Sequence, residues 1–302
     1  AVQGNHPSKL NPITDTSVFL ANEIQSKNYK IFYYDPKDLS VINSKVIASG
    51  FFIKFDYSKK KFFKILKKQK LDLTKCKFIL IRQDPPFNLE YISATYILDT
   101  IKDKVKILNN PTSIRNVSEK LYSVKYQKYM PSTIFTQNMD EIKNFFKMYK
   151  KVILKPIHSF SGNDIHLLNK FNLKLIQKFI KQHDHIMCQK YLPKISKGDK
   201  RVFLINGKVC GAISRVPKKG SFLSNMSKGA VPISIKLTQI EKKISTIIAK
   251  DLKKNNVYFS GIDFIDQKLN GDINVTSPTG LKTYYDLTNI NLAKVFWKGL
   301  KA

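Results

Sequence analysis

The stretch Gly261–Gly280, GIDFIDQKLNGDINVTSPTG, is the most informative part of the chain. Its apolar residues predict two short strands, GIDFI and DINVT, and Asn270-Gly271 predicts a tight turn between them. In such a hairpin Asp263 lies close to Asp272 and Asn274, which share a face because they are two residues apart on one strand. Two carboxylates and an amide oxygen on rigid strands suit Mg²⁺ bound to a nucleotide's phosphates. The alternative is an exposed hairpin whose acids are simply solvated.

The composition of the whole chain makes this acidic cluster stand out. The 302 residues include 53 Lys and Arg against 22 Asp and Glu, which gives a net charge of +31. All but four of the basic residues are lysines, a bias typical of an A/T-rich coding sequence. The lysines are spread along the chain, without an arginine-rich arm or an aromatic RNA-binding motif. We therefore expect no specific nucleic-acid partner, although the charge favours anionic small substrates.

The four arginines are Arg82, Arg115, Arg201 and Arg215. Where most cations have become lysine, a retained guanidinium indicates a need for planar, bidentate contact with phosphate or carboxylate. The alternative is that each is a chance remnant.

Length and cysteine content limit the class of protein. A chain of 302 residues can bury a large core and form two or three subdomains. It contains no apolar run long enough to span a membrane, and its amino terminus has no signal pattern, so we expect no membrane association.

Cys76, Cys188 and Cys210 lie far apart, without zinc or disulfide spacing. We expect a reduced, cytoplasmic protein. Ala1–Gly4 has the character of a strand end, so part of that strand is expected to precede it.

The amino-terminal third alternates predicted helices, at 17–27, 62–70 and 93–102, with predicted strands at 30–34, 77–82 and 105–108. This alternation favours an open parallel sheet covered by helices. The strand at 77–82 runs into RQDPPF, which places Arg82 and Asp84 at the carboxyl edge, where such sheets bind ligands. An ordinary strand-terminating turn is the alternative.

The region from about 116 to 191 contains a second candidate for phosphate binding. A helix is predicted from Ser118, followed by the strand KVILK at 151–155 and a loop at 156–164. Lys155 ends the hydrophobic strand just before the flexible Ser/Gly loop, a position from which lysines reach phosphates. In a chain so rich in lysine, a solvated side chain is the alternative.

These motifs together resemble those of bacterial glutathione synthetase, an ATP-grasp carboxylate–amine ligase. The matching motifs are, in order, DTSVFLANEIQSKNY, RQDPPF, YISATYILD, NNPTSIRNVSEKL, VILKP, QKYLP, GDKRVFLINGK, SRVP and GIDFI with INVTSPTG. The similarity extends from the amino terminus to about Gly280, and all four arginines lie inside matching motifs.

The resemblance implies an α/β protein with an ATP-grasp fold. Residues 1–115 would form an amino-terminal open parallel-sheet domain, 116–191 a central lid domain, and 192–302 a carboxyl-terminal domain with the metal site. The implied reaction is the ATP-dependent ligation of γ-glutamylcysteine and glycine to glutathione through an acyl phosphate, giving ADP and phosphate. Phosphorylation supplies the leaving group that a carboxylate lacks, and water must be excluded from the intermediate. The resemblance also implies a homo-oligomer, because members of this family commonly form oligomers.

The resemblance also implies roles for individual residues. The residues that would bind ATP, the co-substrate, are Lys120, Lys155, Gly162, Gln189, Lys190, Tyr191 and Leu192. The ligands of Mg²⁺ (or Mn²⁺) would be Asp263, Asp272 and Asn274. The residues that would position peptide and glycine are Arg82, Asn225, Ser277 and Thr279. Arg201 and Arg215 would stabilise charge on the transferring phosphoryl group and the tetrahedral intermediate.

The chain departs from the family pattern at several places. The loop Ser159–Gly162 has one glycine where the family has a GMGG sequence, which affects how closely backbone amides approach phosphates. The usual metal-binding glutamate is Asp272, preceded by one inserted residue, and substrate-loop arginines are replaced by Leu223 and Val231. Two alternatives therefore remain. One is a related ligase with a different peptide or amine substrate, and the other is a weakly catalytic nucleotide-binding paralogue.

Overall fold

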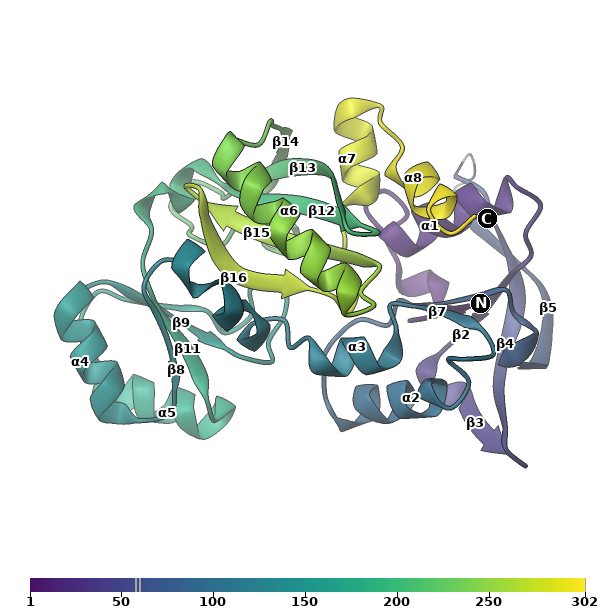
Figure 1. The fold of residues 1–302 in the computed structure, drawn as a ribbon, viewed down its shortest axis with the longest axis horizontal. Helices are drawn as coiled ribbons and strands as arrows, with labels where there is room; N and C mark the ends of the chain where they lie inside the picture. The colour runs from purple at the N-terminus through teal and green to yellow at the C-terminus, as the bar shows by residue number, and fades with distance from the viewer. Residues whose placement is uncertain (58, 60, 302) are drawn as a thin grey trace.

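The computed structural model describes residues 1–57, 59 and 61–301, which form three sheets flanked by helices (Figure 1). The first sheet contains seven strands, in the order β3 (Leu39–Ile42), β4 (Lys45–Phe55), β2 (Ile31–Tyr34), β1 (Val2–Gln3), β6 (Phe78–Ile81) and β7 (Lys106–Leu108), with β5 (Phe63–Asp72) also paired to β4. The pairs among β2, β1, β6 and β7 are parallel, as the alternation of helices and strands predicts. The pairs of β4 with β2, β3 and β5 are antiparallel.

Alternating side chains bury both faces of the first sheet at its strands β1, β2 and β6. Tyr33 and Leu80 pack in one core with α1 (Thr16–Gln25) and α8 (Leu292–Lys298). Ile79 belongs to the core on the other face with α2 (Leu89–Asp99), which is followed by α3 (Pro111–Asn116). Figure 1 shows these pairs of helices on opposite sides of the sheet.

The helix predicted at 62–70 is wrong. These residues form most of β5, which pairs along the length of β4 from Phe55 opposite Phe63 to Ile47 opposite Asp72. The apolar residues at 62, 63, 65 and 66 can be placed on one helical face, but long antiparallel pairing with β4 stabilises the extended form instead.

The second sheet is antiparallel, in the order β10 (His166–Leu168), β9 (Val152–Pro156), β11 (Ile186–Lys190) and β8 (Thr133–Thr136). Its outer face packs on α4 (Met139–Tyr149) and α5 (Leu173–His183), through residues that include Leu154 and Cys188. Ile153 and Lys155 flank Leu154, and Gln189 follows Cys188. Because side chains alternate along a strand, these three face the inner side of the sheet, where they line a pocket.

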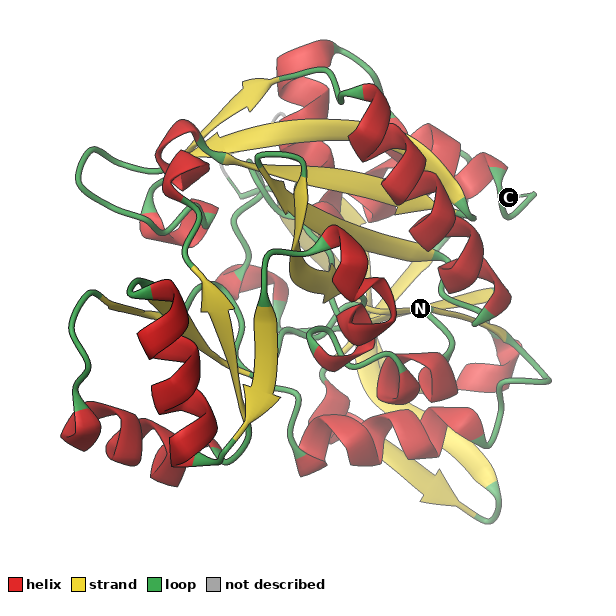
Figure 2. Ribbon diagram, turned by 60° about the vertical axis from the view of Figure 1, so that its left-hand side comes forward, coloured by secondary structure: helices red, strands yellow, loops and turns green. Residues whose placement is uncertain are grey.

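The third sheet is also antiparallel, in the order β14 (Val231–Ser234), β13 (Lys208–Val216), β12 (Asp199–Ile205), β15 (Phe259–Ile265) and β16 (Lys268–Asn274). Helix α6 (Gln239–Lys254) covers one face, where it packs against Val202 and Ile262. The opposite face packs on α7 (Leu281–Thr288) at one end and lines the pocket at the other. Figure 2 shows the second and third sheets side by side.

Short 3₁₀ helices complete the described chain: η1 (Pro7–Lys9), η2 (Pro36–Asp38), η3 (Leu73–Lys75), η4 (Leu121–Tyr129), η5 (Pro193–Lys197) and η6 (Met226–Lys228). The prediction that a helix begins at Ser118 is wrong. Residues 118–120 form a connection between α3 and η4, so Lys120 precedes the helical turns.

The hairpin of β15 and β16 is present, but the expectation of a turn at Asn270-Gly271 is wrong. The turn lies at Asp266 and Gln267, which have positive φ of 47° and 63°, as both central residues of a type I′ hairpin turn require. Asn270-Gly271 lies inside β16 at a bulge. Ile262 pairs with Ile273 and Phe264 with Leu269, so three residues of β16 stand opposite Asp263.

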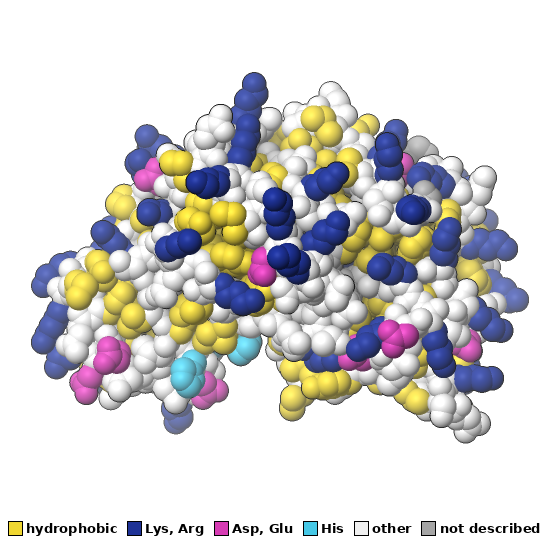
Figure 3. All heavy atoms as spheres, viewed as in Figure 1, with side chains coloured by type: hydrophobic (Ala, Val, Ile, Leu, Met, Phe, Trp, Pro, Cys, Tyr) yellow, Lys and Arg dark blue, Asp and Glu magenta, His cyan; other side chains and the backbone are white. Residues whose placement is uncertain are grey.

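In the described part of the chain no helix is long and apolar enough to cross a membrane. On the face shown in Figure 3, lysine and arginine side chains are scattered over all regions, with few acids among them.

Candidate active site

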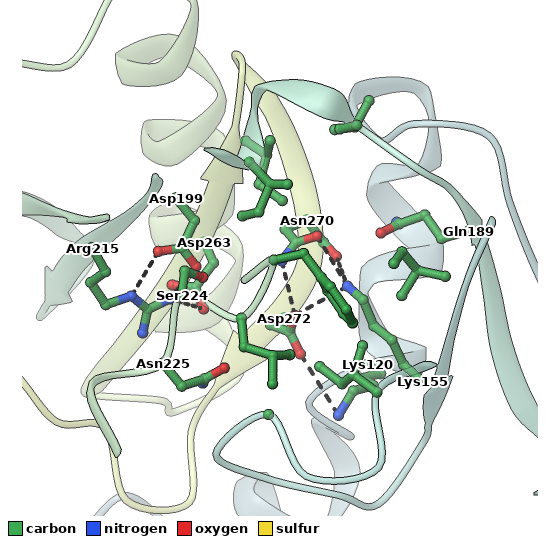
Figure 4. A pocket seen from close by; sticks show the side chains of 18 of the residues that line it. Lys120, Lys155, Gln189, Asp199, Arg215, Ser224, Asn225, Asp263, Asn270 and Asp272 are labelled. Carbon is green, nitrogen blue, oxygen red and sulfur yellow. Dashed lines mark hydrogen bonds and ion pairs between the residues drawn. The ribbon is translucent and has the colours of Figure 1, made fainter. Parts of the chain in front are cut away.

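A pocket lies between the inner face of the second sheet and the third sheet (Figure 4). The structure brings into its lining most of the residues proposed from sequence. These are Lys120, Lys155, Gly162, Gln189, Lys190, Tyr191, Leu192, Arg201, Arg215, Asn225, Asp263, Asp272 and Asn274. They come from segments as distant as the start of η4 and the end of β16, so the fold assembles one site from the expected nucleotide, metal and catalytic groups.

Two buried lysines converge on Asp272, one near each carboxylate oxygen (Figure 4). Lys120 Nζ donates a hydrogen bond to the Ser159 carbonyl at 2.8 Å and lies 3.7 Å from Asp272 Oδ1. Lys155 Nζ donates to the backbone carbonyl and Oδ1 of Asn270, at 2.9 and 3.0 Å, and lies 3.6 Å from Asp272 Oδ2. Burial lowers the pKa of Lys155. Two desolvated ammonium groups held by one carboxylate form a strong site for additional anionic oxygens such as those of phosphates.

Two arginines and two aspartates form a buried charge cluster next to the lysines. Arg201 makes a bidentate contact with Asp263, at 2.5 and 2.8 Å. Arg215 makes a bidentate contact with Asp199, at 2.8 and 2.5 Å, and its Nη2 lies 3.0 Å from Asp263 Oδ2. Strand register creates these pairs, because Arg201 stands opposite Asp263 across β12 and β15, and Asp199 opposite Arg215 across β12 and β13.

Burial and charge act differently on the two aspartates of the cluster. Burial favours the neutral form of Asp263, but its contacts with Arg201 and Arg215 lower its pKa to about 2. Burial raises the pKa of Asp199 in spite of its contact with Arg215. Asp263 therefore stays ionised at neutral pH and provides a fixed negative charge between two guanidinium groups.

The donor set fits a divalent cation that is shared with a ligand. Asp263, Asp272 and Asn274 line the same pocket and offer hard oxygen atoms. Within residues 1–57, 59 and 61–301, no three His, Cys, Asp or Glu side chains are grouped so that they could enclose a metal by themselves. Mg²⁺ is commonly held by one or two carboxylates together with substrate phosphates, which this arrangement permits.

The Ser/Gly loop forms one wall of the pocket and explains why its single glycine is retained. Gly162 has a φ of +72°, and a Cβ there would overlap Asn225 Oδ1. The loop also contacts the segment after β13, where Lys228 Nζ donates to Asn163 Oδ1 at 2.7 Å. The backbone at position 162 therefore requires glycine for both conformation and space.

Three of the proposed substrate residues lie outside the pocket lining. Arg82 is buried and its Nε donates to Ser17 Oγ at 3.0 Å. Ser277 Oγ donates to the Arg82 carbonyl at 3.4 Å, so these two residues are neighbours. Thr279 is exposed at the far end of the same turn.

Sequence reasoning misses several residues of the pocket. Asp199 could have been found, because it lies two residues before Arg201 and therefore on the same face of a strand. Asn270 is expected in a turn, and its contact with Lys155 is therefore not anticipated. Glu119 gives no signal of its own, since the backbone groups that it binds are 156 and 157 residues away in the chain.

The arrangement of the second and third sheets is that of the ATP-grasp fold. A four-stranded sheet with a lysine on its inner face stands against an antiparallel sheet with paired acids and arginines, and solved ATP-grasp ligases have the same fold. The chain aligns with D-cycloserine synthetase DcsG at a TM-score of 0.68, with 9% identity, 99% of this chain and 97% of that chain. D-alanyl-alanine synthetase A from Vibrio cholerae aligns at 0.63, with 14% identity, 99% of this chain and 96% of that chain. At these identities the likeness concerns the fold alone.

Sequence comparison identifies the family within this class. Residues 1–115 match the family model of the prokaryotic glutathione synthetase N-terminal domain, and residues 119–289 match that of the prokaryotic glutathione synthetase ATP-grasp domain. A glutathione synthetase from Brucella melitensis is 34% identical over 306 residues, covering 100% of this chain and 98% of the relative. Another from Buchnera aphidicola subsp. Baizongia pistaciae is 34% identical over 97% of this chain and 93% of the relative. The chain belongs to the prokaryotic glutathione synthetase family.

Proposed function

We propose that this chain ligates γ-glutamylcysteine and glycine to glutathione, using ATP and releasing ADP and phosphate. A carboxylate oxygen of the peptide attacks the γ-phosphorus, ADP leaves, and an acyl phosphate forms. The glycine amine then attacks the carbonyl carbon, the bond from that carbon to the phosphate oxygen breaks, and the amine loses a proton. The observation that carries the proposal is the pocket in which Lys120, Lys155, Arg201 and Arg215 meet three hard-oxygen side chains.

The nucleotide would occupy the part of the pocket under the second sheet. Lys120 and Lys155 would bind its phosphates, because both ammonium groups are buried and directed to one point. The segment Gln189–Leu192, at the end of β11, would hold adenine, and the loop that contains Gly162 would cover the phosphates. Closure of such a loop excludes water, which an acyl phosphate requires.

The metal and the arginines would balance the charge of the reaction. Asp263, Asp272 and Asn274 would hold Mg²⁺ or Mn²⁺, which supplies neutralisation of phosphate charge when bound. Arg201 and Arg215 would donate to oxygens of the transferring phosphoryl group and of the tetrahedral intermediate. Both guanidiniums are buried, so their electrostatic contribution is larger than it would be in water.

The acceptor side of the site is built from other segments. Asn225 lines the pocket, and Arg82, Ser277 and Thr279 belong to the neighbouring turn region, where they would position γ-glutamylcysteine and glycine. We further propose that the protein acts in the cytoplasm on small molecules, as a homo-oligomer, without a specific nucleic-acid or membrane partner.

A second candidate is a ligase of the same type with a different peptide or amine substrate. Leu223 lines the pocket and Val231 is 58% exposed at the start of β14, at positions where the family resemblance leads us to expect arginine. A third, a weakly catalytic nucleotide-binding paralogue, is favoured only by the serines in the loop at 159–162.

Phosphate release from ATP, measured with γ-glutamylcysteine and glycine and with each omitted in turn, tests the proposal. Release that requires both, with glutathione as the product, supports it. Turnover only with another peptide acid or amine would support the second candidate. ATP binding without turnover on any acceptor would favour the third.

A further inference from the structure

The carboxylate of Glu119 binds the chain at the end of β16. One oxygen, Oε1, accepts three hydrogen bonds, from Val275 N at 2.9 Å, Thr276 N at 3.1 Å and Thr276 Oγ1 at 2.8 Å. The Glu119 carbonyl also accepts a hydrogen bond from Ile273 N at 2.8 Å. Glu119 is thus bonded to three residues, Ile273, Val275 and Thr276, of a segment that is distant in sequence.

The residue that follows Glu119 belongs to the nucleotide side of the site. Lys120 Nζ reaches the Ser159 carbonyl of the Ser/Gly loop and lies 3.7 Å from Asp272 Oδ1 on β16. Because Lys120 follows Glu119 directly, any shift of Glu119 along β16 also moves the base of the Lys120 side chain relative to Asp272.

The residues that follow Thr276 belong to the acceptor side of the site. Ser277 Oγ donates to the Arg82 carbonyl at 3.4 Å, and Gly280 N donates to Thr16 Oγ1 at 3.1 Å. The turn 276–280 is therefore held by Glu119 on one side and by Arg82, after β6, and Thr16, in α1, on the other. Glu119 is the side chain that holds the backbone N–H groups of Val275 and Thr276, while Asn109 Nδ2 and Tyr91 Oη donate to their carbonyls.

We propose that Glu119 is a positioning residue that sets the distance between the phosphate-binding Lys120 and the substrate turn 276–280. The inference rests on the proposed function, because it assigns the lysine to ATP and the turn to the peptide and amine. Phosphoryl transfer to a carboxylate requires the two reactants at near-contact distance, and a misplacement of about 1 Å costs about a hundredfold in rate. Glu119 lines the pocket, but its Oε1 is bonded to Val275 and Thr276, so it acts through the two segments that it joins.

Glu119→Ala and Glu119→Gln, together with a matched control, separate this role from simple stabilisation. Asp251 is the control, because its carboxylate accepts hydrogen bonds from Tyr122 Oη at 2.8 Å and Tyr126 Oη at 2.5 Å and joins η4 to α6 outside the pocket. Asp251→Ala therefore removes a comparable link from the same region of the chain. The melting temperature, kcat, and KM for ATP and for γ-glutamylcysteine are measured for each variant, below its own melting transition.

We expect Glu119→Ala to lower kcat by about tenfold to a hundredfold while KM for ATP changes by less than about threefold. Glu119→Gln retains an acceptor oxygen and should keep kcat within about twofold of the wild type. Asp251→Ala should lower the melting temperature and leave kcat unchanged. Equal kcat for Glu119→Ala and Asp251→Ala would overturn the proposal, and so would an equal loss in Glu119→Gln and Glu119→Ala.

If Glu119→Ala does not fold, Thr276→Val provides the same test, because it removes only the hydroxyl donor. A drop in kcat of about threefold with unchanged KM for ATP would support the positioning role, and an unchanged kcat would overturn it. The wild-type protein in the same assay tests the proposed function separately. Absence of glutathione formation by the wild type contradicts that function, whereas wild-type turnover with no effect of the Glu119 or Thr276 variants contradicts only the positioning role.

Discussion

Arg215 lies between two carboxylates with different proton affinities. It contacts Asp199, whose pKa burial raises, and Asp263, whose charge is retained beside Arg201 and Arg215. Buried ion pairs of this kind contribute little net stability, but removing one partner leaves an uncompensated charge that is costly. The cluster is therefore best explained by what it offers to a ligand, namely buried guanidinium groups held in place by their carboxylate partners.

Asp263→Asn should remove most of the activity and also destabilise the protein. The substitution leaves Arg201 without a charged partner and replaces one carboxylate of the proposed metal site by a neutral amide. We expect kcat to fall by at least about a hundredfold and the free energy of unfolding by about 3 kcal/mol. ADP formation and urea denaturation measure the two effects. Normal turnover in this variant would rule out the metal assignment.

Gly162→Ala should impair catalysis beyond its effect on stability. The new Cβ would overlap Asn225 Oδ1 in the pocket, in addition to the strain of a positive φ. Gly220 is a matched control, since it has a φ of +83° and a Cβ added there would meet no atom within 4 Å. Both alanine variants should lose about 1 kcal/mol of stability, and only Gly162→Ala should raise KM for ATP or lower kcat. Equal kinetics in the two variants would mean that the Gly162–Asn225 contact has no catalytic importance.

At the scale of elements, α2 and α3 are joined by one charged contact. Arg115 Nη2 donates to Asp99 Oδ2 at 2.5 Å, Nη1 donates to Thr95 Oγ1 at 3.1 Å, and the guanidinium lies over the Tyr96 ring at 4.1 Å. Of the four arginines, Arg115 alone neither lines the pocket nor contacts a residue proposed to bind substrate. Its guanidinium instead donates hydrogen bonds to the Asp99 carboxylate and to Thr95, a directed contact of the kind expected for a retained arginine.

The Asp99 contact should make stability depend on pH in the acid range. Partial burial favours the neutral carboxyl, but hydrogen bonds from Arg115 and Thr112 lower the pKa of Asp99 below its ordinary value of 3.8. Because the folded pKa is the lower one, this stabilisation is complete above pH 3.8 and is lost as the pH falls through the folded value. Asp99→Asn should therefore be about 1 kcal/mol less stable at pH 7 and differ less from the wild type near pH 3.

Denaturation at both pH values, with exposed Asp103→Asn as the control, tests this expectation. A difference between Asp99→Asn and the wild type that stays the same at pH 7 and pH 3 would show that the contact does not depend on the charge of Asp99.

The elements are predictable from sequence where local pattern and tertiary pairing agree. Helix α1, strands β2 and β6 and the β15–β16 hairpin lie close to their expected positions. Residues 62–70 are misassigned because β5 is stabilised by its partner β4, which local periodicity does not reveal. The turn is misplaced because Asp266 and Gln267 adopt positive φ without the usual glycine, whereas Gly271 serves a bulge.

The candidate site is predictable to a similar extent. Motif resemblance names most of the pocket's polar lining, but it omits Glu119, whose partners depend on how β16 ends against η4. Asp199 is visible from strand alternation alone. The roles of these residues, and the expected domain boundaries after residues 115 and 191, stay predictions.

At the scale of the whole molecule, Asn109 links the first sheet to the third. Its Nδ2 donates to the carbonyls of Phe259 and Val275, at 2.7 and 2.8 Å, and its Oδ1 accepts from Tyr258 N and Phe259 N, at 2.9 and 2.8 Å. The residue follows β7 and is buried, and the two donors and the acceptor oxygen of its side-chain amide all bond to the third sheet or the residues beside it.

Asn109→Ala should destabilise the whole chain by about 2–4 kcal/mol, because buried backbone donors and acceptors lose their partners. Asn138→Ala is the control, since it removes an exposed cap of α4 and should cost about 1 kcal/mol. Chemical denaturation of both variants measures the difference. Equal losses would mean that Asn109 does not hold the sheets together.

The central claim is that the pocket converts a peptide carboxylate to an acyl phosphate before amide formation. The most direct measurement follows oxygen-18 placed in the cysteine carboxylate of γ-glutamylcysteine, with ATP, Mg²⁺ and glycine present. The account predicts glutathione together with inorganic phosphate that contains one labelled oxygen per molecule. Glutathione formed with unlabelled phosphate, or no glutathione at all, would contradict it.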